Sequence, residues 1–198
     1  MTKHQELMTE ILVNGYTESK VALICGSLLR EFIRYEELTQ LILFPNPADL
    51  RYAQQVVSNN SNNNNNNNNV TPSGSANPAA MELPSPVVER LFGFIHLPVF
   101  DIASDAFSTF KLLLIKHKKL VAIFLEAYFE PFFSRYTQVL LLSDSYVTKR
   151  LGLNLLAELL LTRENFSIMM MFISITDYLK IIMSLLRGSQ RIQVEAFH

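Results

Sequence analysis

The stretch from Asp101 to Leu120, DIASDAFSTFKLLLIKHKKL, runs an apolar pattern into a charged turn. Its apolar residues recur every three or four positions, the spacing that places side chains on one face of a helix. These residues are Ile102, Ala103, Ala106, Phe107, Phe110, Leu113 and Leu114. The stretches Val21 to Leu38 and Val147 to Phe166 follow the same plan, and a second apolar segment comes after each turn. The recurrence predicts a repeated helical unit.

The spacing of these units matches that of helical-repeat proteins. Leu120 and Phe166 lie about 46 positions apart, within the range of armadillo and HEAT repeats. Leu38 and Leu120 lie about 82 positions apart, but a low-complexity insertion separates them, and without it the spacing falls near 40. One helical pair cannot bury its own apolar face and must stack on its neighbours. We therefore expect an all-α, armadillo/HEAT-like solenoid with an extended surface that suits the binding of another protein.

Composition agrees with a helical fold and names no ligand. The chain has 198 residues, of which 49% are hydrophobic and only six are glycine, a balance that favours helices over a turn-rich β fold. A formal net charge of −1 argues against general nucleic-acid binding. Cys25 is the single cysteine, so an internal disulfide or a Cys-based zinc cluster is excluded. We expect Cys25 to be a small buried hydrophobic residue, with a reactive nucleophile as the alternative.

The chain divides into three parts by composition. Residues 1–44 are expected to form an N-terminal helical repeat, and residues 86–198 further repeats, of which the last is incomplete. Between them, residues 45–85 begin with two prolines and include an unbroken run of asparagine, so regular structure is expected to stop and the segment to be disordered. This insertion has two interpretations, an inert expanded loop and a prion-like assembly segment.

Several local features predict where helices begin and which face they bury. Thr17 is expected to start a helix, and Ser145 to cap another that runs to Thr162 or Arg163. Charged residues at helix ends are attributed to the helix dipole, namely Asp101, Asp105 and His117. The face expected to be buried in the first of these helices holds Val21, Ile24, Cys25, Leu28, Leu29, Phe32 and Ile33.

No catalytic, cofactor or metal motif is present. The six glycines form neither GxGxxG nor a Walker pattern, the four histidines are scattered, and HExxH, CxxC and GxSxG are absent. We therefore expect no enzyme, no cofactor and no metal site. The N-terminus lacks the apolar core of a signal peptide. The most apolar segment, Phe166 to Leu186, is interrupted by Asp177 and Lys180, so the chain is expected to be soluble and intracellular.

The last residues predict an unfinished repeat. From Gln190 onward the sequence has the start of another repeat's first helix, without the polar capping repeat that solenoids usually need. We therefore expect the chain to be truncated relative to a longer ancestor or gene. The same argument predicts an exposed apolar patch at the C-terminal end, through which the chain could self-associate.

Several strings resemble the Mo-twenty-five (calcium-binding protein thirty-nine) scaffold family. They are FDIASDAF at 100–107, YVTKR at 146–150, ELLL at 158–161, LRE at 29–31 and EAFH at 195–198. The resemblance implies an armadillo-like, right-handed helical solenoid without catalysis of its own. It further implies a concave face that cradles a kinase or pseudokinase domain. It also implies a C-terminal pocket for a Trp-Glu-Phe-type tail of the pseudokinase STRAD.

The resemblance carries over to five residues of this sequence. Arg163 and Phe166 match residues that the family uses to contact the kinase, and Phe100 matches a concave-face contact to the pseudokinase. Arg150 and Met183 match positions that line the tail pocket. An Arg can pair with the acidic residue of such a tail, and a Met can adapt to an aromatic one. The structural alternatives are that Phe100, Phe166 and Met183 are core residues, and that Arg163 complements the end of its own helix.

Three functions remain open at this point. The first is a cytoplasmic scaffold, with polarity sites and the nucleus as further locations, that activates germinal-centre (sterile-twenty) kinases or a kinase–pseudokinase complex such as that of liver kinase B. The second is a generic armadillo-type adaptor or transport protein. The third is a non-functional fragment of a scaffold gene, because the resemblance lacks about the family's first third and its last repeat, and residues 45–90 have no counterpart.

Overall fold

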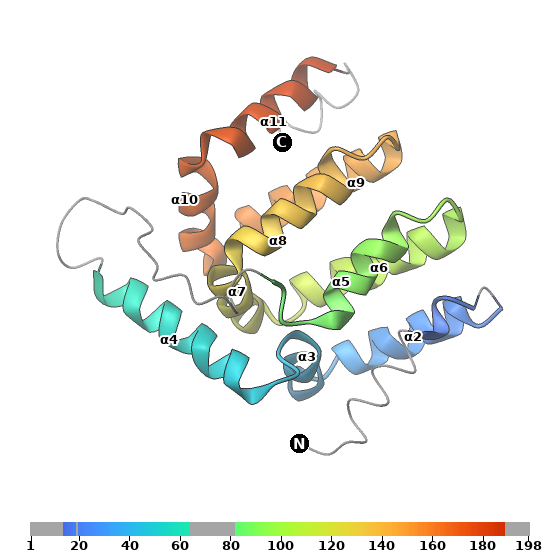
Figure 1. The fold of residues 1–198 in the computed structure, drawn as a ribbon, viewed down its shortest axis with the longest axis horizontal. Helices are drawn as coiled ribbons and strands as arrows, with labels where there is room; N and C mark the ends of the chain where they lie inside the picture. The colour runs from blue at the N-terminus through green and yellow to red at the C-terminus, as the bar shows by residue number, and fades with distance from the viewer. Residues whose placement is uncertain (1–13, 19, 64–81, 189–198) are drawn as a thin grey trace.

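A computed structural model describes residues 14–18, 20–63 and 82–188, and every regular element within these ranges is a helix. The prediction of an all-α chain is therefore confirmed (Figure 1). The predicted segments before residue 14 and from Gln190 onward lie outside the described residues. The helices are α2 (Ala22–Ile33), α3 (Glu36–Leu43), α4 (Pro47–Asn63), α5 (Pro86–Ile95), α6 (Phe100–Ile115), α7 (Lys118–Ala127), α8 (Phe129–Tyr136), α9 (Tyr146–Leu160), α10 (Phe166–Ser174) and α11 (Thr176–Gly188), with a π-helical turn η2 (Thr137–Leu141) and a 3-10 turn η3 (Arg163–Asn165).

The helices stack in rows. In Figure 1, α2, the α5–α6 pair, the α8–α9 pair and α11 follow one another from the lower right to the top of the view, and α3, α7 and α10 lie at their left-hand ends. Helix α2 packs against α6, and α6 in turn contacts α9. Each row thus covers the apolar face of its neighbour, as in a helical-repeat solenoid.

Aromatic side chains connect the rows through the core. Phe92 of α5, Phe110 of α6 and Phe132 of α8 are fully buried, with ring centroids 4.8 to 6.3 Å apart. The contacts continue from Phe133 to Phe172 at 5.3 Å, and from there to Tyr178 of α11 at 4.9 Å. Large rings contribute much of the burial in such cores, and the offset and tilted geometries seen here are the favoured ones. The predicted buried residues of α6 are confirmed, except that Ala103 is only half-buried.

Helix α4 corrects the prediction that regular structure stops at Pro45. Pro47 is the first residue of α4, where its missing N–H costs nothing, and the Asn46 side chain accepts a hydrogen bond from the Ala48 N–H at 3.0 Å. The helix packs along α7, and Ala53 is fully buried there. The first asparagines are part of this helix, and Asn60 donates a hydrogen bond to Glu126 at 2.9 Å. Of the predicted insertion, residues 64–81 lie outside the described part of the chain.

Helix α2 buries only part of the face predicted for it, because Leu29 and Ile33 are buried as expected but Cys25 and Phe32 are only half-buried. It begins at Ala22 rather than at Thr17, and its buried residues are Ala22, Gly26, Leu29 and Ile33. Of the bulky residues predicted to be buried, Val21, Ile24 and Leu28 are exposed instead. The reason is that small residues at positions 22 and 26 allow α2 to approach α6 closely, which the bulkier stripe would prevent.

Polar contacts fix the stacking between rows. Arg135 of α8 pairs with Glu89 of α5 at 2.7 Å, and Lys111 of α6 pairs with Glu158 of α9 at 2.9 Å. The His117 ring nitrogen Nε2 lies 2.8 Å from the Ile33 carbonyl oxygen, at the C-terminal end of α2. His117, which lies between α6 and α7, therefore contacts the C-terminal end of α2, whereas the sequence had suggested a contact with the end of the helix just before it. Such contacts orient the rows but add little stability where they are exposed.

Candidate protein-interaction site

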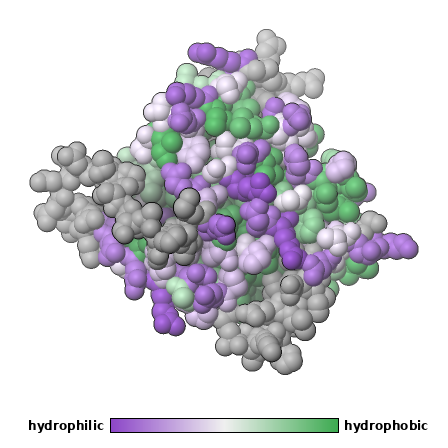
Figure 2. All heavy atoms as spheres, in the orientation of Figure 1, coloured by the Kyte–Doolittle hydropathy of each residue, from purple (hydrophilic) through white to green (hydrophobic). Residues whose placement is uncertain are grey.

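The five residues matched to partner contacts all lie at the surface. Phe100 is 70% exposed, Phe166 is 62% exposed and Met183 is 53% exposed, so the alternative that they are core residues is excluded. Arg150 and Arg163 are exposed as well. Large exposed apolar side chains that gather in patches are typical of interaction surfaces. In the view of Figure 2, hydrophobic side chains gather in patches in the upper and right-hand parts of the molecule, among hydrophilic surface.

Arg163 and Phe166 lie together on the turn between α9 and α10. Arg163 begins η3 and Phe166 begins α10. They line an open surface depression of about 420 Å³ together with Leu161, which is 73% exposed. The full lining consists of Leu160, Leu161, Thr162, Arg163, Phe166 and Met169. Arginine is one of the residue types enriched at energetically important contact positions, and Phe166 adds exposed apolar surface to the same depression.

Hydrogen bonds hold this turn in place. The Thr162 hydroxyl donates to the Glu158 carbonyl at 2.7 Å, and the Asn165 backbone N–H donates to the Thr162 carbonyl at 2.9 Å. The buried Asn165 side chain donates to the Leu159 carbonyl at 2.8 Å. Asn165 therefore connects the last turn of α9 to the first residue of α10. Because Asn165 lies among other polar residues, such as Arg163 and Glu164, the sequence carried no signal for this role.

We expect Asn165→Ala to lower the free energy of unfolding by about 1 kcal/mol, because the side-chain hydrogen bond across the turn is lost while the Leu159 carbonyl keeps the Thr162 backbone N–H as a donor. Equilibrium urea denaturation followed by circular dichroism measures the change. The control is Ser174→Ala, which removes an exposed local hydrogen bond to the Met171 carbonyl and should cost less than about 0.5 kcal/mol. Equal effects of the two substitutions would contradict a structural role for Asn165.

The other three residues do not share this depression. Phe100 is the first residue of α6 and follows the turn after α5, together with the exposed Val99. Arg150 lies in the second turn of α9, and Met183 lies in α11. The lining described above includes none of the three. The structure thus places Arg163 and Phe166 at one depression. The contacts of Arg150 and Met183 with the tail of a pseudokinase stay a prediction.

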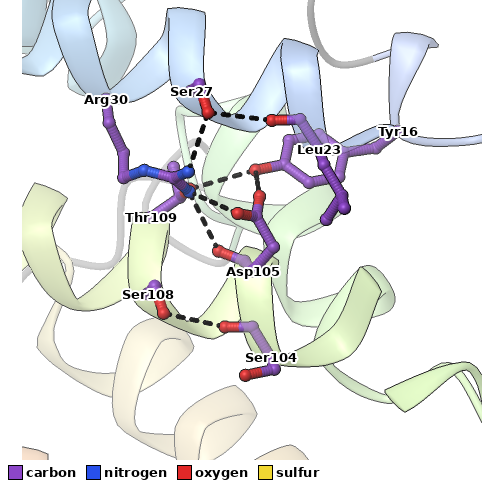
Figure 3. Close-up of polar contacts among 8 residues, drawn as sticks. All are labelled: Tyr16, Leu23, Ser27, Arg30, Ser104, Asp105, Ser108 and Thr109. Atoms are coloured by element: carbon purple, nitrogen blue, oxygen red, sulfur yellow. Dashed lines mark hydrogen bonds and ion pairs between the residues drawn. The ribbon is translucent and has the colours of Figure 1, made fainter. Parts of the chain in front are cut away.

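A partly buried polar network was not predicted from the sequence (Figure 3). The Arg30 guanidinium pairs with the Asp105 carboxylate at 2.8 Å and donates to the Thr109 hydroxyl at 2.8 Å. The Tyr16 hydroxyl donates to Asp105 at 2.9 Å and lies 3.0 Å from Thr109. Burial, together with the hydrogen bond to Asp105, raises the pKa of the Tyr16 hydroxyl far above its ordinary value. Tyr16 therefore stays a neutral donor, as the network requires.

This network fixes α6 against α2. Asp105 and Thr109 are one helical turn apart on α6, and both face Arg30 of α2. The helix-dipole explanation of Asp105 is therefore wrong, because its carboxylate is bound by side chains from another element. The same helix α6 carries Phe100 at its start, so the network also orients the turn that presents Phe100. Nothing in the arrangement resembles a nucleophile with a base, and its role is structural.

Metal and membrane signals are weak in the described part of the chain. Among those residues, no group of three or more His, Cys, Asp or Glu side chains comes together in a way that could hold a metal ion. No single described helix is long and apolar enough to cross a membrane. Two consecutive helical segments, Arg163–Ser174 and Thr176–Leu185, are together long and apolar enough for a span, but the chain bends by 88° between them.

The family model and the individual relatives that match this chain indicate the same family. The Mo25-like family model matches residues 1–198. The human protein "Calcium-binding protein 39-like" is 41% identical over 189 residues, which are 95% of this chain and 44% of the relative. The "Mo25-like protein" of Schizosaccharomyces pombe is 38% identical over 199 residues, covering 100% of this chain and 48% of the relative. "Conidiophore development protein hymA" of Emericella nidulans is 32% identical over 188 residues, which are 94% of this chain and 44% of the relative.

The chain thus spans about half the length of the curated relatives it matches. The match nevertheless runs through the whole of this sequence, and the stacked helical rows agree with it. On these grounds, the chain belongs to the Mo25-like family.

Proposed function

We propose that the chain is a non-catalytic scaffold that binds and allosterically activates a protein kinase of the germinal-centre (sterile-twenty) type, alone or with a pseudokinase. Membership of the Mo25-like family supports a scaffold-type role. The observation that carries the finer proposal is the turn between α9 and α10, where Arg163 and Phe166 border one open depression. We place this activity in the cytoplasm, including polarity sites.

The chemistry of the turn suits a protein partner. Phe166 and Leu161 offer exposed apolar surface, and desolvation of such side chains supplies most of the free energy at the centre of an interface. The Arg163 guanidinium adds planar, charge-assisted donors for a carboxylate or a backbone carbonyl of the partner. Among the described residues, no ion pair engages Arg163, so its charge is available to a partner.

Activation follows from differential binding. A kinase domain exchanges between inactive and active arrangements, and a ligand that binds the active one more tightly raises its population. A thousandfold preference, for example, shifts that equilibrium by about 4 kcal/mol. The rigid turn held by Asn165 can express such a preference, because a preformed surface fits one arrangement better than the other. The scaffold itself performs no chemical step.

Two further contacts are part of the proposal. Phe100, at the start of α6, contacts the pseudokinase, and Arg150 with Met183 contacts the acidic and aromatic residues of its C-terminal tail. The exposure of Phe100 and Met183 supports this assignment, since each leaves an apolar side chain in water in the free protein.

The test is a reconstituted kinase assay. The full chain is titrated into a germinal-centre kinase catalytic domain, and phosphorylation of a peptide substrate and the dissociation constant are measured. We expect activation by the wild-type chain, and a loss of affinity of roughly thirtyfold or more for Phe166→Ala and for Arg163→Ala, as at interface hot spots.

Matched controls separate contact from fold. Leu23→Ala removes an exposed apolar side chain of α2, and Arg51→Ala removes an exposed charge of α4, both away from the α9–α10 turn. Both should leave activation unchanged. Absence of any complex with the wild-type chain refutes the proposal, as do equal losses in the controls.

A further inference from the structure

Three of the chain's seven methionines follow one another on α10, at positions 169 to 171. Met169 lines the depression at the α9–α10 turn and is half-buried. Met170 is 47% exposed. Met171 is half-buried and packs against the core. Two of the three thioether side chains are therefore open to solvent, one of them in the candidate interaction site.

Met169 and Met170 extend the apolar surface that begins at Phe166. They follow Phe166 by three and four residues on the same helix, the spacing at which side chains are neighbours on one helix face. Phe166 and Met169 also line the depression together with Arg163. Methionine suits such a surface, because its flexible, polarisable side chain adapts to the shape of a partner. Any chemical change of these two methionines therefore acts at the proposed kinase contact.

Oxidation is a common chemical change of accessible methionines, and it makes the side chain polar. In the reaction with a peroxide, a lone pair of the sulfur attacks one peroxide oxygen, and the O–O bond breaks. The oxygen stays on the sulfur as a sulfoxide, the thioether loses two electrons, and hydrogen peroxide is reduced to water. A partner that covers the sulfoxide must remove water from a polar group, which weakens binding unless the partner supplies a hydrogen bond.

On Met169 the new oxygen has a second effect. A sulfoxide oxygen accepts hydrogen bonds, and the Arg163 guanidinium in the same lining donates them. A sulfoxide bound by Arg163 occupies the donors that the proposed function assigns to a carboxylate or carbonyl of the kinase. Oxidation of Met169 therefore removes apolar surface and engages the charge of the depression at the same time.

We propose that Met169 and Met170 form a reversible oxidation site that weakens the binding of the kinase to the α9–α10 turn. This inference rests on the proposed function. The oxidant is a peroxide, and the return to the thioether requires methionine sulfoxide reductases and a thiol reductant. Met170 reacts first, because the oxidant reaches its exposed side chain directly, and the half-buried Met169 follows.

The first experiment determines which methionines react. The full chain, in a Cys25→Ser background, is treated with dilute hydrogen peroxide, and tandem mass spectrometry follows the gain of one oxygen atom at each methionine over time. We expect Met170 and the exposed Met183 to react first, Met169 next, and Met171 last, because it packs against the core. Oxidation of Met171 ahead of Met169 and Met170 overturns the proposal.

The second experiment measures the dissociation constant for a germinal-centre kinase catalytic domain before and after oxidation. Oxidation should weaken binding by about tenfold or more, and reductases for both sulfoxide epimers should restore it. In the double variant Met169→Leu with Met170→Leu, the two constants should agree, because leucine is not oxidised. Met183→Leu is the matched control, since it removes an exposed methionine outside the depression and should leave the loss on oxidation as large as in the parent chain. Circular dichroism checks that the oxidised chain remains folded.

The outcomes separate this inference from the proposed function. If the untreated chain binds the kinase and the oxidised chain binds equally well, only this inference fails. An equal loss of affinity in the double leucine variant also refutes it, because the sensitive group then lies elsewhere. If the untreated chain binds no kinase, the proposed function fails and this inference fails with it.

Discussion

Gly26→Ala is expected to lower the free energy of unfolding by about 3 kcal/mol, as other insertions into tightly packed interiors do. A Cβ atom at this position would overlap the Asp105 carboxylate and the Tyr16 hydroxyl. Neither group can yield freely, because Tyr16 is fully buried and Asp105 is held by Arg30. The methyl group would therefore separate α2 from α6 and break the polar network. Urea denaturation followed by circular dichroism measures the loss.

Gly93→Ala is the matched control for this substitution. Gly93 is also helical, in α5, but a Cβ atom there would meet no atom within 4 Å. Ala is the better helix former by about 0.5–1 kcal/mol, so Gly93→Ala should stabilise the chain by up to this amount. Opposite signs for two Gly-to-Ala changes would show that close packing, and not helix propensity, decides the effect at position 26. A neutral Gly26→Ala would contradict the close approach.

The glycine comparison also explains why the sequence misidentified part of the buried face of α2. This helix has two apolar stripes with the same period, one with bulky Ile24 and Leu28, the other with Ala22 and Gly26. Periodicity cannot choose between them, and hydrophobicity favours the bulkier one. The choice is made by the neighbour, because Asp105 of α6 reaches the backbone of α2 only where side chains are small. Such a preference is a property of the pair of helices and is not contained in either segment alone.

Elements with local signals were predicted well. Ser145 caps α9 as expected, accepting a hydrogen bond from the Thr148 N–H at 3.3 Å. The stripe of α6 is buried almost as predicted, because the neighbouring helices, α2 and α5 foremost, cover its apolar side. Helix α4 was missed, because the asparagine run that begins at its C-terminal end suggests low complexity and its burial depends on packing against α7. Tertiary packing outweighed composition there.

In the candidate site, too, the sequence predicted some features, and others depend on tertiary structure. The family resemblance supplied the identities of Arg163 and Phe166, and only the structure placed both at one depression. The choice between core residue and surface contact was open for Phe100 and Phe166, and it could be decided only by their exposure. Asn165, by contrast, carries no exposed chemistry, and its hydrogen bond across the turn depends on backbone geometry that no sequence pattern specifies.

Asp105→Ala is expected to destabilise the chain by about 2–3 kcal/mol, at or just below the lower end of the range for removal of one partner from a buried ion pair. Arg30 would keep its charge in a place where only 28% of its side chain meets solvent, and the Tyr16 hydroxyl would lose its acceptor on Asp105. Thr109 remains as a neutral partner to both, so the loss falls short of that for an isolated buried charge. Urea denaturation gives the free energy of unfolding.

A double substitution separates the cost of an unpaired charge from the value of the pair. Arg30→Met with Asp105→Leu removes both charges and fills the space with apolar atoms, so it should be less destabilising than Asp105→Ala alone. Asp101→Ala, in the exposed first turn of the same helix, should cost no more than about 1 kcal/mol. If the double variant is instead the least stable, the pair contributes net stability beyond compensation of its own burial. The Arg30–Asp105 contact would then hold α2 on α6 by attraction, and not only by excluding other alignments of the two helices.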